Sequence, residues 1–222
     1  EMDIILCHAT ADFDTLGAAV GAARLYPGAR IDLTGGMQLP VREFMSLYRD
    51  EYPLIEMRSV DLKAIARLIL VDTQSPSYLG KAAEWLTLPG VEIHVYDHHP
   101  QDPKPEFEVA LSCVEPVGST CTLIIERLQA KEIALTPFEV TALALGIHVD
   151  TGSLTFAHTT ARDAIALAWL MQQGVNLTVL STYIDYAMSP LMQEVLSRGL
   201  AELPAHTETI QGYQIAVWAI QY

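Results

Sequence analysis

Acidic and histidine side chains follow three hydrophobic segments of this sequence, each just past the point where a strand is predicted to end. They are His8, Asp12, Asp14, Asp72, Asp97, His98 and His99. Because the carboxyl ends of parallel strands meet at one edge of a sheet, we expect these side chains to converge there. Clustered carboxylates repel one another unless cations lie between them, and mixed oxygen and nitrogen ligands suit Mn²⁺, Mg²⁺, Fe²⁺ or Zn²⁺. The residue types therefore predict a metal site.

The number of ligands favours two ions over one. If Asp150 joins the group, the edge holds five carboxylates and three imidazoles. A single ion takes about four to six protein ligands, whereas two ions about 3.5–4 Å apart can share a carboxylate and hold water between them. Such a pair activates water and stabilises negative charge on a phosphoryl group, so the pattern indicates hydrolysis of a phosphate ester.

The triplet Asp97-His98-His99 lies at the centre of this pattern. Successive side chains that leave a strand point to opposite sides, so we expect His98 and His99 to have different roles rather than to bind one ion together. A polar turn that ends at Pro100, with no metal, is the alternative interpretation of the triplet taken alone.

Alternating strand and helix signals place these residues in an α/β fold. Strands are predicted at 2–7, 29–33, 67–71, 91–95 and 107–111, and helices at 15–26, 40–52 and 78–86. Repeated strand-helix-strand units predict a parallel, Rossmann-like sheet flanked by helices.

A mainly helical stretch follows the predicted sheet. Its helices are predicted from Gly118-Ser119-Thr120 to about 130, then at 138–149 after the cap Thr136-Pro137, at 161–173 and at 190–200. The apolar segment 214–220 reads as a strand without a partner strand, so we expect it to begin an incomplete second domain or to pair with another molecule. The expected division is a first domain at 1–203, followed at 204–222 by a linker and the start of a truncated C-terminal domain.

Composition and charge limit the class of protein. The chain has 222 residues, 50% of them hydrophobic, and a formal net charge of −14. Such a surface repels a phosphate polymer, so a nucleic-acid substrate would need bound metal ions or basic residues that this chain lacks. No apolar run reaches the roughly 18 residues that would span a bilayer and no leader is visible, which predicts a cytoplasmic protein without a membrane partner. Cys7, Cys113 and Cys121 fit buried thiols in a reducing compartment.

Four motifs, in this order, resemble those of the DHH phosphoesterase family. They are His8-x-x-x-Asp12-x-Asp14, Asp72 after a hydrophobic strand, Asp97-His98-His99, and Asp150-Thr151-Gly152-Ser153. The family includes RecJ-type exonucleases, nano-RNases, phosphodiesterases for linear or cyclic dinucleotides, and manganese-dependent inorganic pyrophosphatases. Within it, segments 11–16, 41–44 and 152–156 are similar to bacterial chains that fuse this domain to CBS domains and a tRNA nucleotidyltransferase-like domain.

The resemblance implies a role for each motif residue, with two Mn²⁺ ions, or Mg²⁺ or another divalent metal, as the cofactor. The implied ligands are His8, Asp12 and Asp72 for the first ion, and Asp14, Asp72, His98 and Asp150 for the second. Asp72 would then bridge the ions, Asp97 would orient a ligand, and His99 would contact the substrate phosphate. Water held between the ions would attack phosphorus.

The resemblance also implies a substrate and a missing part. Family members with this core carry a C-terminal domain that contributes a Gly-rich, histidine-containing loop and basic residues, and nothing in 204–222 matches it. The expected substrate is a small phosphodiester, either a dinucleotide or a short single-stranded oligonucleotide, held with the help of that domain. The alternative is a non-catalytic module that binds metal and nucleotide and regulates a fused tRNA nucleotidyltransferase-like enzyme. The oligomeric state stays open, a homo-oligomer included.

Other polar residues have less specific patterns. His94 in a strand and His148 on an apolar helix are expected to be packed or hydrogen-bonded rather than to bind metal. His158 follows Asp150 closely enough to line the cleft, but exposure at the surface is the favoured interpretation of a residue in a polar loop. The turn Gly118-Ser119-Thr120 is interpreted either as an ordinary helix cap or as a phosphate site made by unpaired helix amides.

Overall fold

The computed structural model describes the chain in two compact units. The units are Glu1–Ile184 and Asp185–Tyr222, and the described residues are 1–33, 35–100, 107–184, 190–203, 207–211 and 213–216. The first unit contains every predicted metal ligand. This division falls earlier in the chain than the expected boundary at 203/204, because the helix before that boundary belongs to the second unit.

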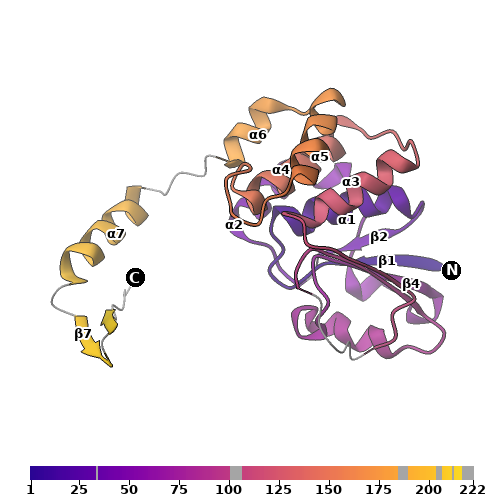
Figure 1. The fold of residues 1–222 in the computed structure, drawn as a ribbon. Helices are drawn as coiled ribbons and strands as arrows, with labels where there is room; N and C mark the ends of the chain where they lie inside the picture. The colour runs from indigo at the N-terminus through magenta and orange to yellow at the C-terminus, as the bar shows by residue number, and fades with distance from the viewer. Residues whose placement is uncertain (34, 101–106, 185–189, 204–206, 212, 217–222) are drawn as a thin grey trace. The chain divides into compact units, whose positions relative to one another are not determined.

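Six parallel strands form one sheet among the described residues of the first unit (Figure 1). They are β1 (Met2–Leu6), β2 (Arg30–Asp32), β3 (Leu54–Ile55), β4 (Ile65–Val71), β5 (Glu92–Asp97) and β6 (Leu111–Val114). Their order in the sheet is β3-β2-β1-β4-β5-β6, so the direction in which strands are added reverses between β1 and β4. Open parallel sheets of this order bind their ligands at that switch point, outside the carboxyl ends of the strands. The predicted parallel α/β fold is confirmed.

Alternate residues along each strand pack into separate cores on the two faces of the sheet. In β4, Ile69 and Val71 face one core, whereas Leu68 and Leu70 face the other, and all four are fully buried. A parallel sheet covered on both faces requires such continuous apolar strands.

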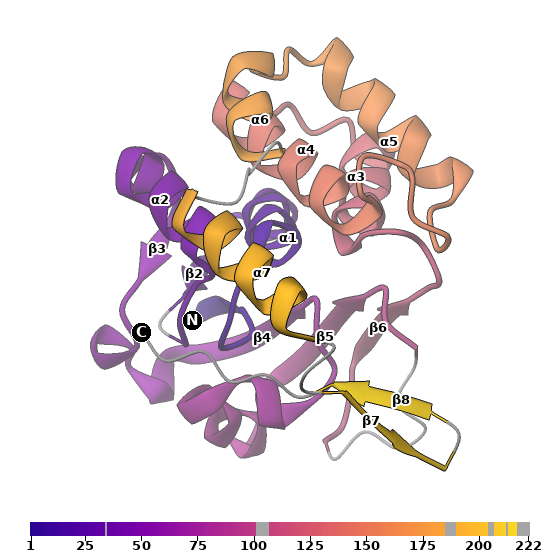
Figure 2. The ribbon, with the colours of Figure 1, turned by 90° about the vertical axis from the view of Figure 1, so that its left-hand side faces the viewer.

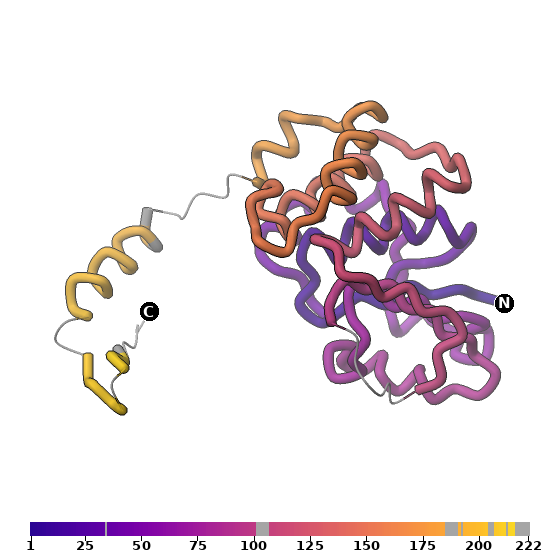
Figure 3. The backbone as a smooth tube through the Cα atoms, in the orientation of Figure 1, coloured from indigo at the N-terminus to yellow at the C-terminus, as the bar shows by residue number. Residues whose placement is uncertain are grey.

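Helices cover one face of this sheet and 3₁₀ turns cover the other (Figure 2). The helices are α1 (Phe13–Leu25), α2 (Leu39–Tyr48), α3 (Thr120–Ala130), α4 (Pro137–Thr151), α5 (Ala161–Gln172) and α6 (Leu177–Ile184). The backbone tube shows α5 and α6, in orange, on this helical side (Figure 3). On the opposite face lie the turns Pro76–Tyr78 and Gly80–Thr87, where an α-helix was predicted at 78–86. That prediction is therefore wrong in helix type, although Trp85 and Leu86 are buried as its apolar pattern required.

Helix α1 approaches α3 and α4 closely because its packing face is made of small residues. A Cβ atom on Gly17 would lie 2.7 Å from the carbonyl oxygen of Ala142, and one on Gly21 would lie 2.5 Å from a methyl carbon of Ile124. Glycine inside a helix costs about 1 kcal/mol relative to alanine. Here the close approach offsets that cost, and it fixes the first turn of α1, which carries Asp14, against the start of α3.

The second unit holds helix α7 (Pro190–Glu202) and the antiparallel strands β7 (Thr207–Ile210) and β8 (Tyr213–Ala216). The apolar strand predicted from residue 214 thus has a partner strand, contrary to expectation. Its pairing with β7 runs from Thr207 with Ala216 to Ile210 with Tyr213. Residues 217–220 of that prediction lie outside the described residues.

Candidate metal centre

The switch point between β1 and β4 collects the predicted ligands. His8 and Asp12 follow β1, Asp14 lies in the first turn of α1, Asp72 follows β4, and His98 follows β5. Asp150 comes from the last turn of α4, so it lies on a helix and not in the loop that its sequence suggested. Ligand atoms of these residues fall into overlapping groups within 4.8 Å: His8, Asp12 and Asp72; Asp14, His98 and Asp150; and Asp72, His98 and His99.

Asp72 lies at the centre of this arrangement in a strained backbone conformation. Its φ angle is 62°, in the left-handed region, which costs a non-glycine residue about 1–2 kcal/mol. The side chain is buried and accepts hydrogen bonds from the hydroxyls of Thr15 at 2.6 Å and Thr120 at 3.1 Å. The conformation places its two oxygens 3.5 Å from His8 Nε2 and 3.6 Å from His98 Nε2, so one carboxylate faces both halves of the site.

Asp14 is fully buried against the first turn of α3. Its carboxylate accepts hydrogen bonds from Ser119 Oγ at 2.5 Å and from the amides of Thr120 and Cys121 at 2.7 and 2.9 Å. Burial and the neighbouring charge of Asp72 nevertheless raise the pKa of Asp14 above its usual value. The three hydrogen-bond donors therefore do not bring the pKa of Asp14 back to its usual value.

The imidazole of His98 is oriented as a metal ligand would be. Its Nδ1 lies 3.1 Å from the carbonyl oxygen of Val117, which fixes the proton on that nitrogen and leaves the Nε2 lone pair pointing into the site. Nε2 is buried and lies 3.1 Å from Asp150, 3.6 Å from Asp72 and 3.7 Å from Asp14. Among the described residues it is the one buried side-chain nitrogen or oxygen without a hydrogen-bond partner. A cation among these atoms would satisfy all of them.

The protonation of this cluster also fits a cation. Burial lowers the pKa of His98, but the carboxylates of Asp150, Asp14 and Asp72 outweigh it and raise that pKa to about 10. Burial and the charge of Asp14 raise the pKa of Asp150 to about 7. Without metal, the cluster compensates its negative charge by holding protons, and a divalent ion would displace them.

His98 and His99 do not point to opposite sides as predicted. Their rings lie 4.3 Å apart, because β5 ends at Asp97 and the alternation of a strand does not extend to them. Their partners do differ. His99 is half exposed, and its Nδ1 lies 2.7 Å from Asp97, which also accepts a hydrogen bond from Gln74 at 2.8 Å. Asp97 therefore orients His99.

His8 and Asp12 form the more open half of the site. Nδ1 of His8 accepts a hydrogen bond from the amide of Thr10 at 3.2 Å, and Asp12 caps α1 by accepting from the amide of Thr15 at 3.0 Å. Burial lowers the pKa of His8, but the carboxylate of Asp72 outweighs it and raises that pKa. The hydroxyl of Thr15 lies within 3.2 Å of both Asp12 and Asp72, so it connects this half of the site to Asp72.

Two cavities open on either side of His99. One, of about 390 Å³, is lined by His8, Asp72 and Gln74, and the other, of about 860 Å³, by His98, Asp150 and Phe156. His99 lines both. The site is therefore accessible to a ligand larger than water from two directions.

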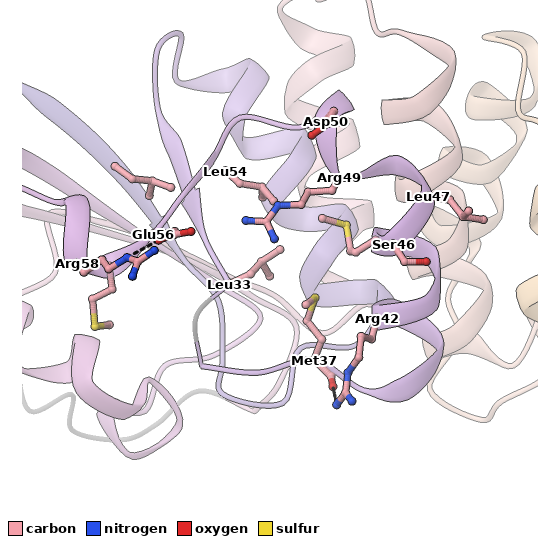
Figure 4. A pocket seen from close by; sticks show the side chains of 13 residues that line it. Leu33, Met37, Arg42, Ser46, Leu47, Arg49, Asp50, Leu54, Glu56 and Arg58 are labelled. Carbon is pink, nitrogen blue, oxygen red and sulfur yellow. Dashed lines mark hydrogen bonds and ion pairs between the residues drawn. The ribbon is translucent and has the colours of Figure 1, made fainter.

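A further cavity, of about 850 Å³, lies between α2 and the segment around β3 (Figure 4). Its lining includes the apolar Leu33 and Leu54 and the basic Arg42, Arg49 and Arg58. None of the predicted metal ligands lines it. It is therefore separate from the metal centre.

The structure decides between the two interpretations of the Gly118-Ser119-Thr120 turn. Ser119 Oγ accepts from the amide of Cys121, and the Gly118 amide donates to Asp163 at 2.9 Å. With the Thr120 amide bound to Asp14, the turn is a helix cap whose donors bind internal carboxylates, and the phosphate-site interpretation is wrong.

The remaining sequence candidates lie largely where expected. His94 pairs with the hydroxyl of Tyr26 at 2.7 Å, and His158 is exposed, with Nε2 2.8 Å from the backbone carbonyl of Asp150. The three cysteines are buried and unpaired. Sequence reasoning assigned no role to Thr15, Gln74 or Asp163, since their partners are distant in the chain or lie inside turns.

These features define the first unit as a Rossmann-like domain that carries a cluster of carboxylates and imidazoles at the switch point of its sheet. Residues 4–147 match the DHH family, N-terminal domain. The chain belongs to this family, whose phosphoesterase members use divalent metals.

Two kinds of curated protein are similar in sequence to this chain. The chain is 37% identical over 220 residues to the A-adding tRNA nucleotidyltransferase of Geobacter sulfurreducens, and 32% identical over 188 residues to the cyclic-di-AMP phosphodiesterase GdpP of Geobacillus thermodenitrificans. These alignments cover 97% and 78% of this chain, but 24% and 28% of those proteins. The chain therefore spans about a quarter of the length of these curated relatives.

Solved structures share the fold. An exopolyphosphatase-related protein of Bacteroides fragilis superposes with a TM-score of 0.72 at 13% identity, over 90% of this chain and 61% of that one. A protein assigned as a family II inorganic pyrophosphatase of Methanococcus jannaschii gives 0.61 at 24% identity, over 79% and 57%. In the described part of this chain, no helix combines the length and apolar character needed to cross a membrane.

Proposed function

We propose that this domain hydrolyses a small phosphodiester, a dinucleotide or a short single-stranded oligonucleotide, with two divalent ions, Mn²⁺ by preference. The observation that carries the proposal is the buried Nε2 of His98, which has no hydrogen-bond partner and is surrounded by three carboxylates. An arrangement of this kind is costly unless a cation completes it. The candidate ligands fall into separate groups, His8 and Asp12 with Asp72 in one and Asp14, His98 and Asp150 in another, which supports two ions rather than one.

Each residue of the cluster has a distinct role in this proposal. His8, Asp12 and Asp72 would hold one ion, and Asp14, Asp72, His98 and Asp150 the other. When bound, the ions would supply an activated water and neutralise charge that develops on the phosphoryl group. His99, oriented by Asp97 and exposed between two cavities, would donate a hydrogen bond to a phosphate oxygen and fix the phosphorus in place.

The length of the substrate is proposed from charge. The chain carries 27 acidic residues against 13 lysines and arginines, which disfavours a long polyanion. We therefore propose that this chain is a poor exonuclease on long strands and acts on short substrates. Three buried, unpaired thiols support a reducing compartment, the cytoplasm, as the location.

A second candidate is a non-catalytic module that binds metal and nucleotide and regulates tRNA nucleotidyltransferase-like activity elsewhere in a longer protein. The specific support is the 37% and 35% identity to two A-adding tRNA nucleotidyltransferases, from Geobacter sulfurreducens and Aquifex aeolicus. The two candidates share the metal centre and differ in whether a bound diester is cleaved.

Product analysis separates these candidates. Purified chain with Mn²⁺ is incubated with a panel of dinucleotides, short RNAs and pyrophosphate, and products are identified by mass spectrometry. We expect slow cleavage of dinucleotides that Asp150→Asn abolishes, whereas Asp61→Asn, at an exposed 3₁₀ cap, leaves it unchanged. Binding without cleavage, in this chain and in a longer one, would favour the regulatory module.

A further inference from the structure

The larger cavity beside the metal centre has an apolar wall directly next to the proposed ligands. His98 and Asp150 line this cavity of about 860 Å³ together with the apolar side chains of Val117, Val149 and Phe156. An apolar surface of this kind has no use in binding a phosphate group. It fits the part of a substrate that is flat and uncharged.

Phe156 is exposed and yet held in place. About half of its surface, 51%, is open to solvent. Its ring packs over Gly152, where a Cβ atom would lie 2.6 Å from a ring carbon, so only glycine permits this position. The backbone is also fixed, because the amide of Phe156 donates to the carbonyl of Thr151 at 2.9 Å. A ring held this way binds a flat partner at little cost in conformational entropy.

His158 extends this aromatic surface and connects it to the metal centre. Its ring centroid lies 5.8 Å from that of Phe156. Its Nε2 lies 2.8 Å from the backbone carbonyl of Asp150, the residue whose side chain faces His98. The aromatic pair therefore has a defined position relative to the cluster.

The charged residues that line this cavity are compatible with the binding of a neutral aromatic ring. Glu115, its acidic residue outside the metal centre, pairs with Arg162 at 2.8 Å and with Arg127 at 3.5 Å. Stacking needs no cation, so it suits a chain with a formal net charge of −14.

We propose that Phe156, flanked by His158, is a stacking platform for the nucleobase attached to the phosphate at the metal centre. The proposal rests on the function proposed above and deepens it. It makes the domain selective for nucleotides over other phosphate esters. Stacking of one base on an aromatic side chain contributes about tenfold or more in affinity.

Calorimetry tests this platform without requiring turnover. Adenosine 5′-monophosphate and ribose 5-phosphate, which differ by the base alone, are titrated into the chain in Mn²⁺. We expect the nucleotide to bind at least about tenfold more tightly, this ratio to fall close to one in Phe156→Ala, and Phe156→Trp to keep it. Phe138→Ala, which removes an exposed ring at the other end of α4, is the matched control and leaves the ratio unchanged.

Two results would overturn the platform. One is an unchanged ratio in Phe156→Ala. The other is equal weakening of both ligands with a lower melting temperature, which would assign Phe156 a purely structural role beside Asp150. Failure of the proposed hydrolysis would show separately, as tight and base-dependent nucleotide binding in a chain that cleaves no dinucleotide.

Discussion

Two regions of the molecule place a fully buried aspartate against the first residues of α3. Asp14 comes from the metal centre and Asp163 from α5. Asp163 accepts hydrogen bonds from the amides of Gly118 and Thr160 and from the hydroxyl of Thr122. Both side chains are buried and bind similar donors, but the pKa values of the two carboxyl groups shift in opposite directions.

The difference lies in the neighbours beyond the donors. Burial raises the pKa of Asp163, but the hydroxyls of Thr122 and Thr160 and nearby amides outweigh it and hold that pKa below its usual value. Burial raises the pKa of Asp14 too, and there the charge of Asp72 adds to it. The charge of Asp72, added to the effect of burial, thus separates Asp14, a proposed metal ligand, from Asp163, whose hydrogen bonds outweigh its burial.

The largest contrast is expected between Asp72→Asn and Asp163→Asn in metal content and activity. Asp72→Asn keeps the shape of the side chain and removes the proposed bridging charge. Metal content should fall from about two ions per chain to fewer than one, and diester cleavage at least about a hundredfold. Asp163→Asn should keep its metal at 20 °C. Elemental analysis of protein purified without chelator measures the metal content of both variants. Equal loss of metal in the two would contradict the distinction between Asp72 and Asp163.

Asp163→Asn should instead destabilise the fold, by about 3 kcal/mol at pH 7, because an amide group would face donors of Gly118 and Thr160. A depressed pKa contributes stability above the unfolded value of about 4, and this contribution is lost as pH falls through the folded value. The gap between wild type and variant in urea unfolding should therefore narrow below about pH 4. A gap that persists unchanged at pH 3 would contradict this assignment.

Metal removal should act on the cluster of Asp14 and not on Asp163. Mn²⁺ at a hundred times its dissociation constant adds about 2.7 kcal/mol per site, or about 5–10 °C in melting temperature for a chain of this size. EDTA should reverse the shift. Asp163→Asn should show the same metal-dependent increment as wild type, whereas Asp72→Asn should show almost none.

Asp150→Asn should have the opposite sign to Asp163→Asn in protein without metal. A carboxyl group whose folded pKa is raised to about 7 destabilises the fold increasingly between the unfolded value of about 4 and pH 7. The variant should therefore melt at a higher temperature than wild type at pH 8, with the difference shrinking toward pH 4. Differential scanning calorimetry in EDTA measures it, and a lower melting temperature at pH 8 would refute the crowding explanation.

The smallest effect is expected at Gln74. Gln74→Ala removes one donor to Asp97 and leaves the Asp97–His99 pair, so turnover should fall about tenfold while metal content stays constant. His99→Ala should lower turnover further, again with metal retained. Loss of metal in either variant would indicate that His99 is a metal ligand rather than a residue that contacts the substrate.

The sheet and the convergence of the cluster were predictable because both follow from local patterns. The central strands β1, β4 and β5 read as apolar runs, and parallel strands must deliver their following residues to one edge. The short strand β3 was not predicted, and β6 (Leu111–Val114) lies after the strand predicted at 107–111. The donors that fix those residues were not predictable. Thr120 reaches Asp72 across 48 positions and Asp163 reaches Gly118 across 45, and no periodicity records such pairs.

The errors have local physical causes. The polar run after Val149 suggested a loop, but α4 continues through Asp150 until Gly152 ends it in a left-handed conformation. Strand β7 was missed because Thr207 and Glu208 lack an apolar alternation, so β8 looked as though it had no partner. The left-handed backbone of Asp72 could not be inferred either, since aspartate rarely adopts it.

That backbone conformation sets the direction in which selection acts on position 72. Asparagine tolerates a φ of 62° better than most side chains, keeps an oxygen that can accept a hydrogen bond from Thr15 or Thr120, and brings no charge to the crowded site. A laboratory selection for heat resistance in the presence of chelator should therefore enrich asparagine at position 72, whereas any lineage that depends on the chemistry must keep aspartate. Among homologous sequences, the residue at this one position would separate copies that retain the activity from copies that keep only the scaffold.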